Sequence, residues 1–223
     1  AKLLASLPDY QFLMAIQSTN PNTLKYIGAR PATDQFLKKA RELREWVPDL
    51  KLKIDIMLGL PGDNFKGFID TLDYTLSLEP FYIVLNYPVY LLPGSRFYDQ
   101  RFALGLVYHP SPPFSVIETP TFPKTDIERA LRIAIWVQIL TYYYPAVAKL
   151  FYRHAQSDGD RIGRLRRWID TIEDKVNLFF SYDSLIDAAT ASSGEWNSIK
   201  KGLLEKASTS ENAYSIYSSI WKL

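Results

Sequence analysis

Hydrophobic and polar positions form two alternating patterns along the first half of the chain, one typical of strands and one typical of helices. Short apolar runs have the length and composition of buried strands, at residues 10–16, 50–59 and 81–90. Helices are predicted between and after these strands, at residues 20–28, 32–47, 64–80 and within 93–105. The evidence is either an apolar residue at every third or fourth position or a helix-start signal. Strands that alternate with helices predict a parallel sheet with right-handed crossovers.

Two of these helices carry recognisable start signals. Asn20 is a suitable N-cap, and Pro21 behind it suits the first helical position. Residues 93–105 hold a turn, then Ser95 as the expected N-cap, then a short helix that ends at Gly105. Three strands make a poor sheet on their own, so we expect its missing neighbours to precede residue 1.

The alternation stops in the second half. Residues 106–124 are rich in proline and predict a surface connector with one short strand. Helical patterns follow at residues 125–155, 157–181 and about 209–222, with a break at 190–198. We therefore predict two domains, an α/β part over residues 1–122 and a helical C-terminal domain over residues 123–223.

The most apolar stretch, residues 130–152, is a candidate for a membrane-spanning helix. It contains Arg132, Gln138 and Lys149, and Pro145 interrupts it. The uninterrupted part is short for a bilayer, so the pattern favours a buried, kinked helix, with a membrane-surface role as the alternative. We do not expect a membrane partner, and without a signal-peptide pattern at the start we expect a cytoplasmic protein.

Composition removes several classes of function. The chain has no cysteine, which excludes a zinc–thiolate site, a thiol nucleophile or an iron–sulfur cluster held by its own residues. His109 and His154 lie in different predicted domains, so no metal site is expected. The net charge of +2 gives no indication of a nucleic-acid partner. The aromatic share of 14% provides residues for a pocket around a flat ligand as well as for a core.

The stretch "KIDIMLGLPGDN", residues 53–64, holds the most informative carboxylate. Ile54 and Ile56 point to one side of the predicted strand, so Asp55 points to the other. A carboxylate in such a strand is costly unless it is hydrogen-bonded or paired. Ribose hydroxyls or a buried arginine would satisfy Asp55, and a structural hydrogen bond to loop backbone is an equally good interpretation.

The glycine turn that follows, Gly59 to Gly62, has two interpretations. A turn between strand and helix can present backbone N–H groups to an anion. However, no Gly-Lys-Ser/Thr follows, and the three-glycine dinucleotide pattern is absent. The alternative, which the sequence favours, is a turn that packs closely on a neighbouring segment.

Four segments occur in an order that resembles a known family. They are "FLMAIQSTNPNTLKYIGAR", "KIDIMLGLPGDNFKGFIDTLDY", "VYLLPGSRFYDQRFALGLVY" and "PPFSVIETPTF". Together, over about residues 10–122, they resemble the second half of radical S-adenosylmethionine enzymes. Within that family, the four segments are similar to the cobalamin-binding subgroup, which includes the anaerobic magnesium-protoporphyrin monomethyl ester cyclase. Oxygen-independent coproporphyrinogen oxidase and the methylthiotransferases are similar over the same segments.

The resemblance implies a fold and a set of site residues. The fold is the C-terminal half of a partial (β/α) barrel followed by an α-helical domain. Gln17 matches a polar residue that faces the cofactor or substrate, and Arg30 matches the arginine that pairs with the methionine carboxylate. Asp55 matches the residue that accepts from the ribose hydroxyls. Asn86 to Leu91, including Tyr90, match the segment that approaches adenine.

The site implied by the resemblance needs an enclosure around the substrate. Tyr87, Tyr90 and Phe114 are candidates to line it for a large flat substrate, and core packing is their alternative role.

The family's CxxxCxxC cluster motif is missing from these residues. We therefore expect a fragment, inactive alone, whose parent supplies the [4Fe–4S] cluster and the upstream half of its own barrel. The resemblance implies S-adenosylmethionine as cofactor, raises cobalamin as another, and indicates cyclisation or methyl transfer on an organic, tetrapyrrole-like small molecule. The alternative is a non-enzymatic interaction module with an α/β scaffold and a helical binding domain.

Overall fold

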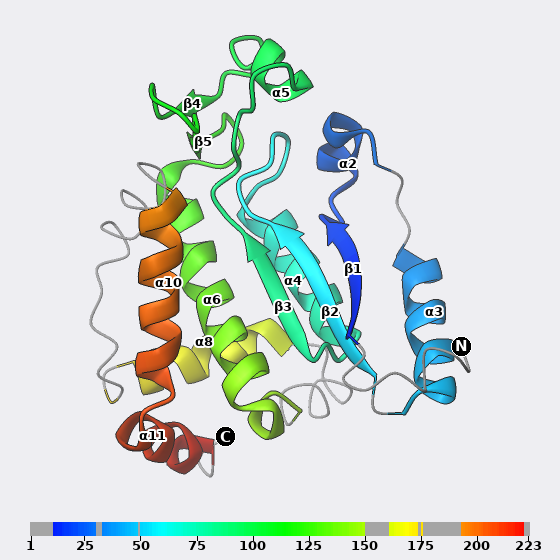
Figure 1. Cartoon of the computed structure of the whole chain (residues 1–223), viewed down its shortest axis with the longest axis vertical. Coiled ribbons are helices and arrows are strands. Elements are labelled where there is room, and N and C mark those ends of the chain that lie inside the picture. The colour runs from blue at the N-terminus through cyan, green and yellow to red at the C-terminus, as the bar shows by residue number, and fades with distance from the viewer. Residues whose placement is uncertain are drawn as a thin grey trace.

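A three-stranded parallel sheet forms the centre of the structure (Figure 1). The structure is a computed structural model that describes residues 11–29, 33–48, 50–149, 161–173, 175 and 193–220. The strands β1 (Gln11–Gln17), β2 (Lys51–Met57) and β3 (Tyr82–Asn86) lie side by side in the order β1-β2-β3. The predicted strands and their parallel pairing are confirmed.

The predicted helices of the first half are present. They are α2 (Pro21–Ile27), α3 (Thr33–Trp46), α4 (Phe65–Ser77) and the short α5 (Arg96–Gln100). Asn20 caps α2 through its side-chain oxygen, which accepts from the backbone N–H of Asn22 at 3.0 Å. Ser95 caps α5 in the same way, accepting from the N–H of Tyr98. Both sequence-predicted caps are therefore confirmed.

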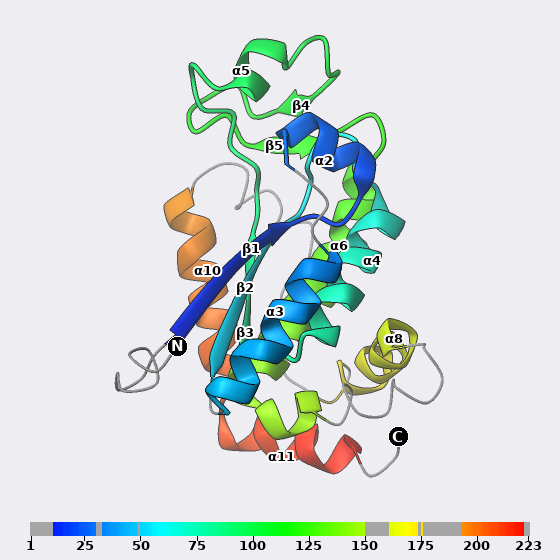
Figure 2. The ribbon, with the colours of Figure 1, turned by 90° about the vertical axis from the view of Figure 1, so that its right-hand side faces the viewer.

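The two faces of the sheet are covered by helices to different extents. Leu52, Ile54 and Ile56 of β2 are fully buried on the face covered by α4 and α6 (Lys124–Tyr143). Figure 2 shows α3, α4 and α6 on this side of the sheet. The opposite face carries Leu13, which is 55% exposed, and the half-buried Asp55. A sheet with one open face fits a wall of a barrel, and the partial barrel itself remains a prediction.

The described helices of the second half are α6, α8 (Arg161–Ile172), α10 (Ser193–Ala207) and α11 (Ser210–Ile220). Trp136 of α6 and Trp168 of α8 are fully buried, with ring centroids 5.5 Å apart. Their apolar residues join those of the sheet in one continuous core. The boundary that we predict between residues 122 and 123 stays a prediction.

The apolar stretch at residues 130–152 is a buried, interrupted helix as far as residue 149. The helix α6 ends at Tyr143, and residues 145–149 are helical again after Tyr144. Pro145 lacks the N–H that would continue the α6 hydrogen-bond pattern, so the break falls directly before it. Among the described residues, none of the helices has the length and hydrophobicity that a bilayer crossing requires.

Two sequence predictions about short elements are wrong. The connector holds two short antiparallel strands, β4 (Val107–Tyr108) and β5 (Val116–Glu118), where one was predicted. Strands of two or three residues are too short to show a hydrophobic period. Part of the predicted break at 190–198 is helical, because α10 begins at Ser193. The parts of the helical predictions at 150–155, 157–160, 176–181 and 221–222 lie outside the described residues.

Candidate functional site

A pocket of about 670 Å³ opens where the parallel strands end. Gln17 of β1, Met57 of β2 and Asn86 of β3 come to it from the three strand ends. Helix α2 contributes Tyr26 and Ile27, and the segment after β3 contributes Tyr87 to Tyr90. Ligands of open parallel sheets gather at this edge, and the volume is in the range of small-molecule sites.

Gln17 reaches the pocket through an irregular strand end. Ala15 pairs with Asp55, but Gln17 pairs with Ile56, so one residue of β1 bulges out of the register. Gln17 also adopts a left-handed backbone with a φ of 62°. Such a conformation is unfavourable for a residue with a side chain, and residues held in it are enriched at functional sites. The bulge thus brings a polar side chain to the pocket edge.

Asp55 lies on the open face of the sheet, between Ala15 of β1 and Val84 of β3. Burial raises the pKa of its carboxyl, and an interaction with the Asn86 side chain opposes that rise. Asn86 does not satisfy the carboxylate fully, since Oδ1 is buried without a hydrogen-bond partner in the described part of the chain. Asp55 does not itself line the pocket, but Asn86 does.

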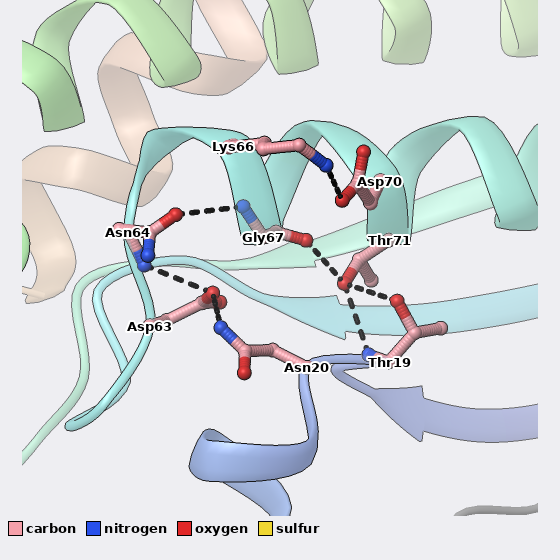
Figure 3. A network of polar contacts seen from close by, with 8 residues as sticks. All are labelled: Thr19, Asn20, Asp63, Asn64, Lys66, Gly67, Asp70 and Thr71. Atoms are coloured by element: carbon pink, nitrogen blue, oxygen red, sulfur yellow. Dashed lines mark hydrogen bonds and ion pairs between the residues drawn. The ribbon is translucent and has the colours of Figure 1, made fainter.

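The glycine turn is held by a buried polar network (Figure 3). Asp63 is fully buried, and its Oδ1 accepts from Asn20 Nδ2 at 2.9 Å and from the Asn64 N–H at 3.0 Å. Burial raises the pKa of Asp63, and these hydrogen bonds lower it by less. Thr19 joins the same region to α4, because its N–H donates to Thr71 Oγ1 at 2.9 Å.

Positive φ angles and, at Gly62, close packing account for the glycines of this turn. Gly62 has a φ of +79°, and a Cβ there would come within 2.6 Å of the Tyr26 ring. Gly59 has a φ of +89°, and because an added Cβ would make only an ordinary contact with Ile127 Cδ1 at 3.7 Å, its backbone conformation rather than lack of space favours glycine. The interpretation as a turn packed on a neighbouring segment is confirmed, and the turn positions Tyr26 at the pocket.

The segment after β3 folds into a cap beside the pocket, which we define as residues 88–118. A small apolar cluster stabilises it, made of Leu60, Val89, Leu91, Leu106 and Val116. The guanidinium carbon of Arg101 lies 4.1 Å from the ring centroid of Tyr98 and 4.4 Å from that of Phe102. Arg101 Nε donates a hydrogen bond to the Tyr108 hydroxyl at 3.0 Å. The cap therefore has its own packing.

The structure brings together three of the five sequence-predicted site residues. Gln17, Asn86 and Tyr90 line the pocket, Asp55 interacts with Asn86 beside it, and Arg30 lies outside the described residues.

The predicted aromatic lining is correct only in part. Tyr87 and Tyr90 line the pocket, whereas Phe114 packs against Tyr98 within the cap, with centroids 5.6 Å apart.

Sequence reasoning missed several lining residues. They are Tyr26 and Ile27 of α2, and Leu92, Ser95, Arg96 and Phe97 of the cap. The sequence predicted the chain turn at Pro93-Gly94, but it did not predict the direction in which this turn folds the cap. Among the described residues, no group of His, Asp or Glu has an arrangement that could hold a metal ion.

The chain is similar to enzymes named for tRNA modification. No family model matches it. The tRNA-2-methylthio-N(6)-dimethylallyladenosine synthase of Aliarcobacter butzleri is 32% identical over 83 residues, which is 37% of this chain and 19% of that protein. The enzyme of the same name from Nitratiruptor sp. is 35% identical over 89 residues, 39% of this chain and 21% of that protein.

A longer match shows the same relationship at lower identity. The enzyme of that name from a Sulfurihydrogenibium sp. is 19% identical over 172 residues, 74% of this chain and 35% of that protein. The chain thus spans about a fifth to a third of the length of these relatives.

These relatives are tRNA methylthiotransferases, which are radical S-adenosylmethionine enzymes. Their similarity supports an enzyme of this broad class, which the sequence analysis predicted. It gives no support to the magnesium-protoporphyrin cyclase resemblance or to cobalamin. The expectation of no nucleic-acid partner is also unsupported, because the relatives are named for acting on tRNA.

Proposed function

We propose that this chain forms part of the S-adenosylmethionine-binding wall of a radical S-adenosylmethionine enzyme. The observation that carries the proposal is Asp55, whose buried Oδ1 has no hydrogen-bond partner among the described residues. An unsatisfied buried carboxylate oxygen is costly, and a ligand with hydroxyl donors would remove that cost. Its interaction with Asn86 joins it to the pocket at the strand ends.

The residues of the site have chemical groups that suit the parts of S-adenosylmethionine. Asp55 would accept from the ribose hydroxyls, and Asn86 to Tyr90 would lie against the adenine. Gln17 would contribute an amide to the cofactor or the substrate. Tyr26 and Tyr87 would exclude water from the site, since both side chains line the pocket. Bound S-adenosylmethionine supplies, on reduction, a carbon radical that removes a hydrogen atom from the substrate.

The iron–sulfur cluster does not fit the residues of this chain. Such clusters are held by cysteine thiolates, and the chain has none. Under the proposal, the cluster ligands belong to residues beyond these 223. The role of this chain is then to bind and orient the cofactor and substrate, while electron delivery takes place elsewhere.

For the substrate, the comparisons favour an adenosine of tRNA over a tetrapyrrole. The relatives are named for methylthiolation of a modified adenosine. Methylthio transfer to tRNA is therefore the first substrate reaction to assay, with methyl transfer or cyclisation of another organic substrate after it. A non-enzymatic interaction module is not favoured.

The decisive experiment uses the full-length protein, purified without oxygen and reconstituted with iron and sulfide. We expect a [4Fe–4S] spectrum, and 5′-deoxyadenosine after addition of S-adenosylmethionine and reductant. Asp55→Ala should weaken S-adenosylmethionine binding about tenfold, the scale of a lost hydrogen bond to a charged group. Asp99→Ala, an exposed carboxylate of α5, is the matched control. Unchanged binding in Asp55→Ala would refute the cofactor wall.

A further inference from the structure

Arg96 is distinctive among the residues around the pocket. Among the described residues that line it, Arg96 is the one with a formal charge at neutral pH. The others are aromatic, aliphatic or neutral polar, including Tyr26, Tyr90 and Phe97. The pocket therefore combines flat apolar walls with a single guanidinium group.

The guanidinium of Arg96 is available to a ligand. Its Nε donates to Gln100 Oε1 at 3.2 Å, an exposed contact with a neutral group one turn along α5. Within the described parts of the chain, no carboxylate forms an ion pair with it. The contrast is Arg101, whose guanidinium lies between two rings of the cap. Arg96 thus retains donors that match a carboxylate or a phosphate.

The position of Arg96 separates it from the residues that we assign to the cofactor ribose. Asn86 lines the pocket at the end of β3, and Asp55 of β2 interacts with Asn86 beside the pocket. Arg96 begins α5 in the cap and is exposed to solvent. An anionic substituent of a ligand in this pocket would therefore meet the one formal charge of the described lining residues on the cap side.

We propose that Arg96 makes this pocket selective for a planar ligand that carries an anionic group, a phosphate or a carboxylate. The inference rests on the proposed function in taking this pocket as the ligand site, and it adds the ligand's charge. Aromatic walls bind planar rings with little regard to substituents. The single cation then discriminates between charged and uncharged versions of one ring system.

The test compares ligands that differ only in their anionic group, on the full-length protein. The phosphate pair is adenosine 5′-monophosphate against adenosine. The carboxylate pair is S-adenosylhomocysteine against its decarboxylated analogue, 5′-deoxy-5′-(3-aminopropylthio)adenosine. For at least one pair, we expect the wild type to bind the anionic member about fivefold more tightly, the scale of a partly exposed ion pair. Arg96→Gln should abolish that preference, and Arg96→Lys should retain part of it.

A matched control separates this effect from a general loss of positive charge. Arg41→Gln removes an exposed arginine of α3 that does not line the pocket, and it should leave both preferences unchanged. Loss of the phosphate preference alone identifies a phosphate ligand, and loss of the carboxylate preference alone identifies a carboxylate.

Two results would overturn the proposal. One is a wild type without preference in either pair, and the other is a preference that Arg96→Gln keeps in full. Failure of the cofactor-wall proposal has a different signature, because it appears as unchanged S-adenosylmethionine binding in Asp55→Ala.

Discussion

Gly67, in the first turn of α4, lies against the buried network of the glycine turn (Figure 3). A Cβ at this position would lie 2.4 Å from Asp63 Oδ1 and 2.5 Å from Asn20 Nδ2. These two atoms are joined by the 2.9 Å hydrogen bond that ties β1 to the turn after β2. Gly67→Ala therefore forces a methyl group against both the donor and the acceptor of this bond.

The magnitude follows from three contributions. Alanine is favoured over glycine in a helix by about 1 kcal/mol, which would stabilise the variant. Overpacking in a buried region costs about 1–3 kcal/mol. Displacing the Asn20 amide leaves the fully buried Asp63 short of a donor, at a cost of about 1–3 kcal/mol. We expect a net loss of about 1–5 kcal/mol in the free energy of unfolding.

The matched control is Gly202→Ala. Gly202 lies in α10, is exposed, and has nothing within 4 Å of an added Cβ. The same substitution should raise the free energy of unfolding by about 0.5–1 kcal/mol there.

Urea unfolding followed by circular dichroism measures both variants. A Gly67→Ala variant that is stabilised as much as Gly202→Ala would show that the network yields to a methyl group, which would refute the reasoning.

Two further predictions concern acidic side chains. Burial raises the pKa of Asp63, so the folded state holds its proton more tightly than the unfolded state between pH 3.8 and the raised value. Relative to Asp63→Asn, the wild type should therefore gain stability as pH falls from 7 towards 4. Urea unfolding at each pH measures this, and a parallel pH dependence in both proteins would contradict it. Glu173→Gln should lower the free energy of unfolding by about 1–3 kcal/mol, less at high salt, because Glu173 accepts from Arg132 at 2.7 Å and from Trp136 Nε1 at 2.7 Å. An unchanged urea midpoint would show that solvent replaces these bonds.

The local structure of the first half was predictable because its signals are local. The cap at Asn20 and the alternation around Asp55 are each written within a few residues of sequence. The strands β1, β2 and β3 formed where apolar runs of sufficient length occurred. The short strands β4 and β5 could not be predicted, because their pairing partners are distant and their length hides any period.

The candidate site was predictable only in its strand-end residues. Gln17 and Asn86 could be placed at one edge, because parallel strands bring their carboxyl ends together. Arg96 could not, because nothing in its neighbourhood shows that the cap folds back over the strand ends. The left-handed backbone of Gln17 was equally hidden, since no glycine or proline marks it.

The sequence by itself determined the parallel α/β arrangement, the helix starts and the side of the strand to which Asp55 points, because periodicity and capping act between near neighbours. Only the tertiary structure decided what each of these features contacts. It packed the glycine turn on Tyr26 and brought Asn86 to Asp55. It also gave the pocket a single cation through Arg96 among its described lining residues. Such contacts join segments tens of residues apart, and they depend on how whole elements pack rather than on any local pattern.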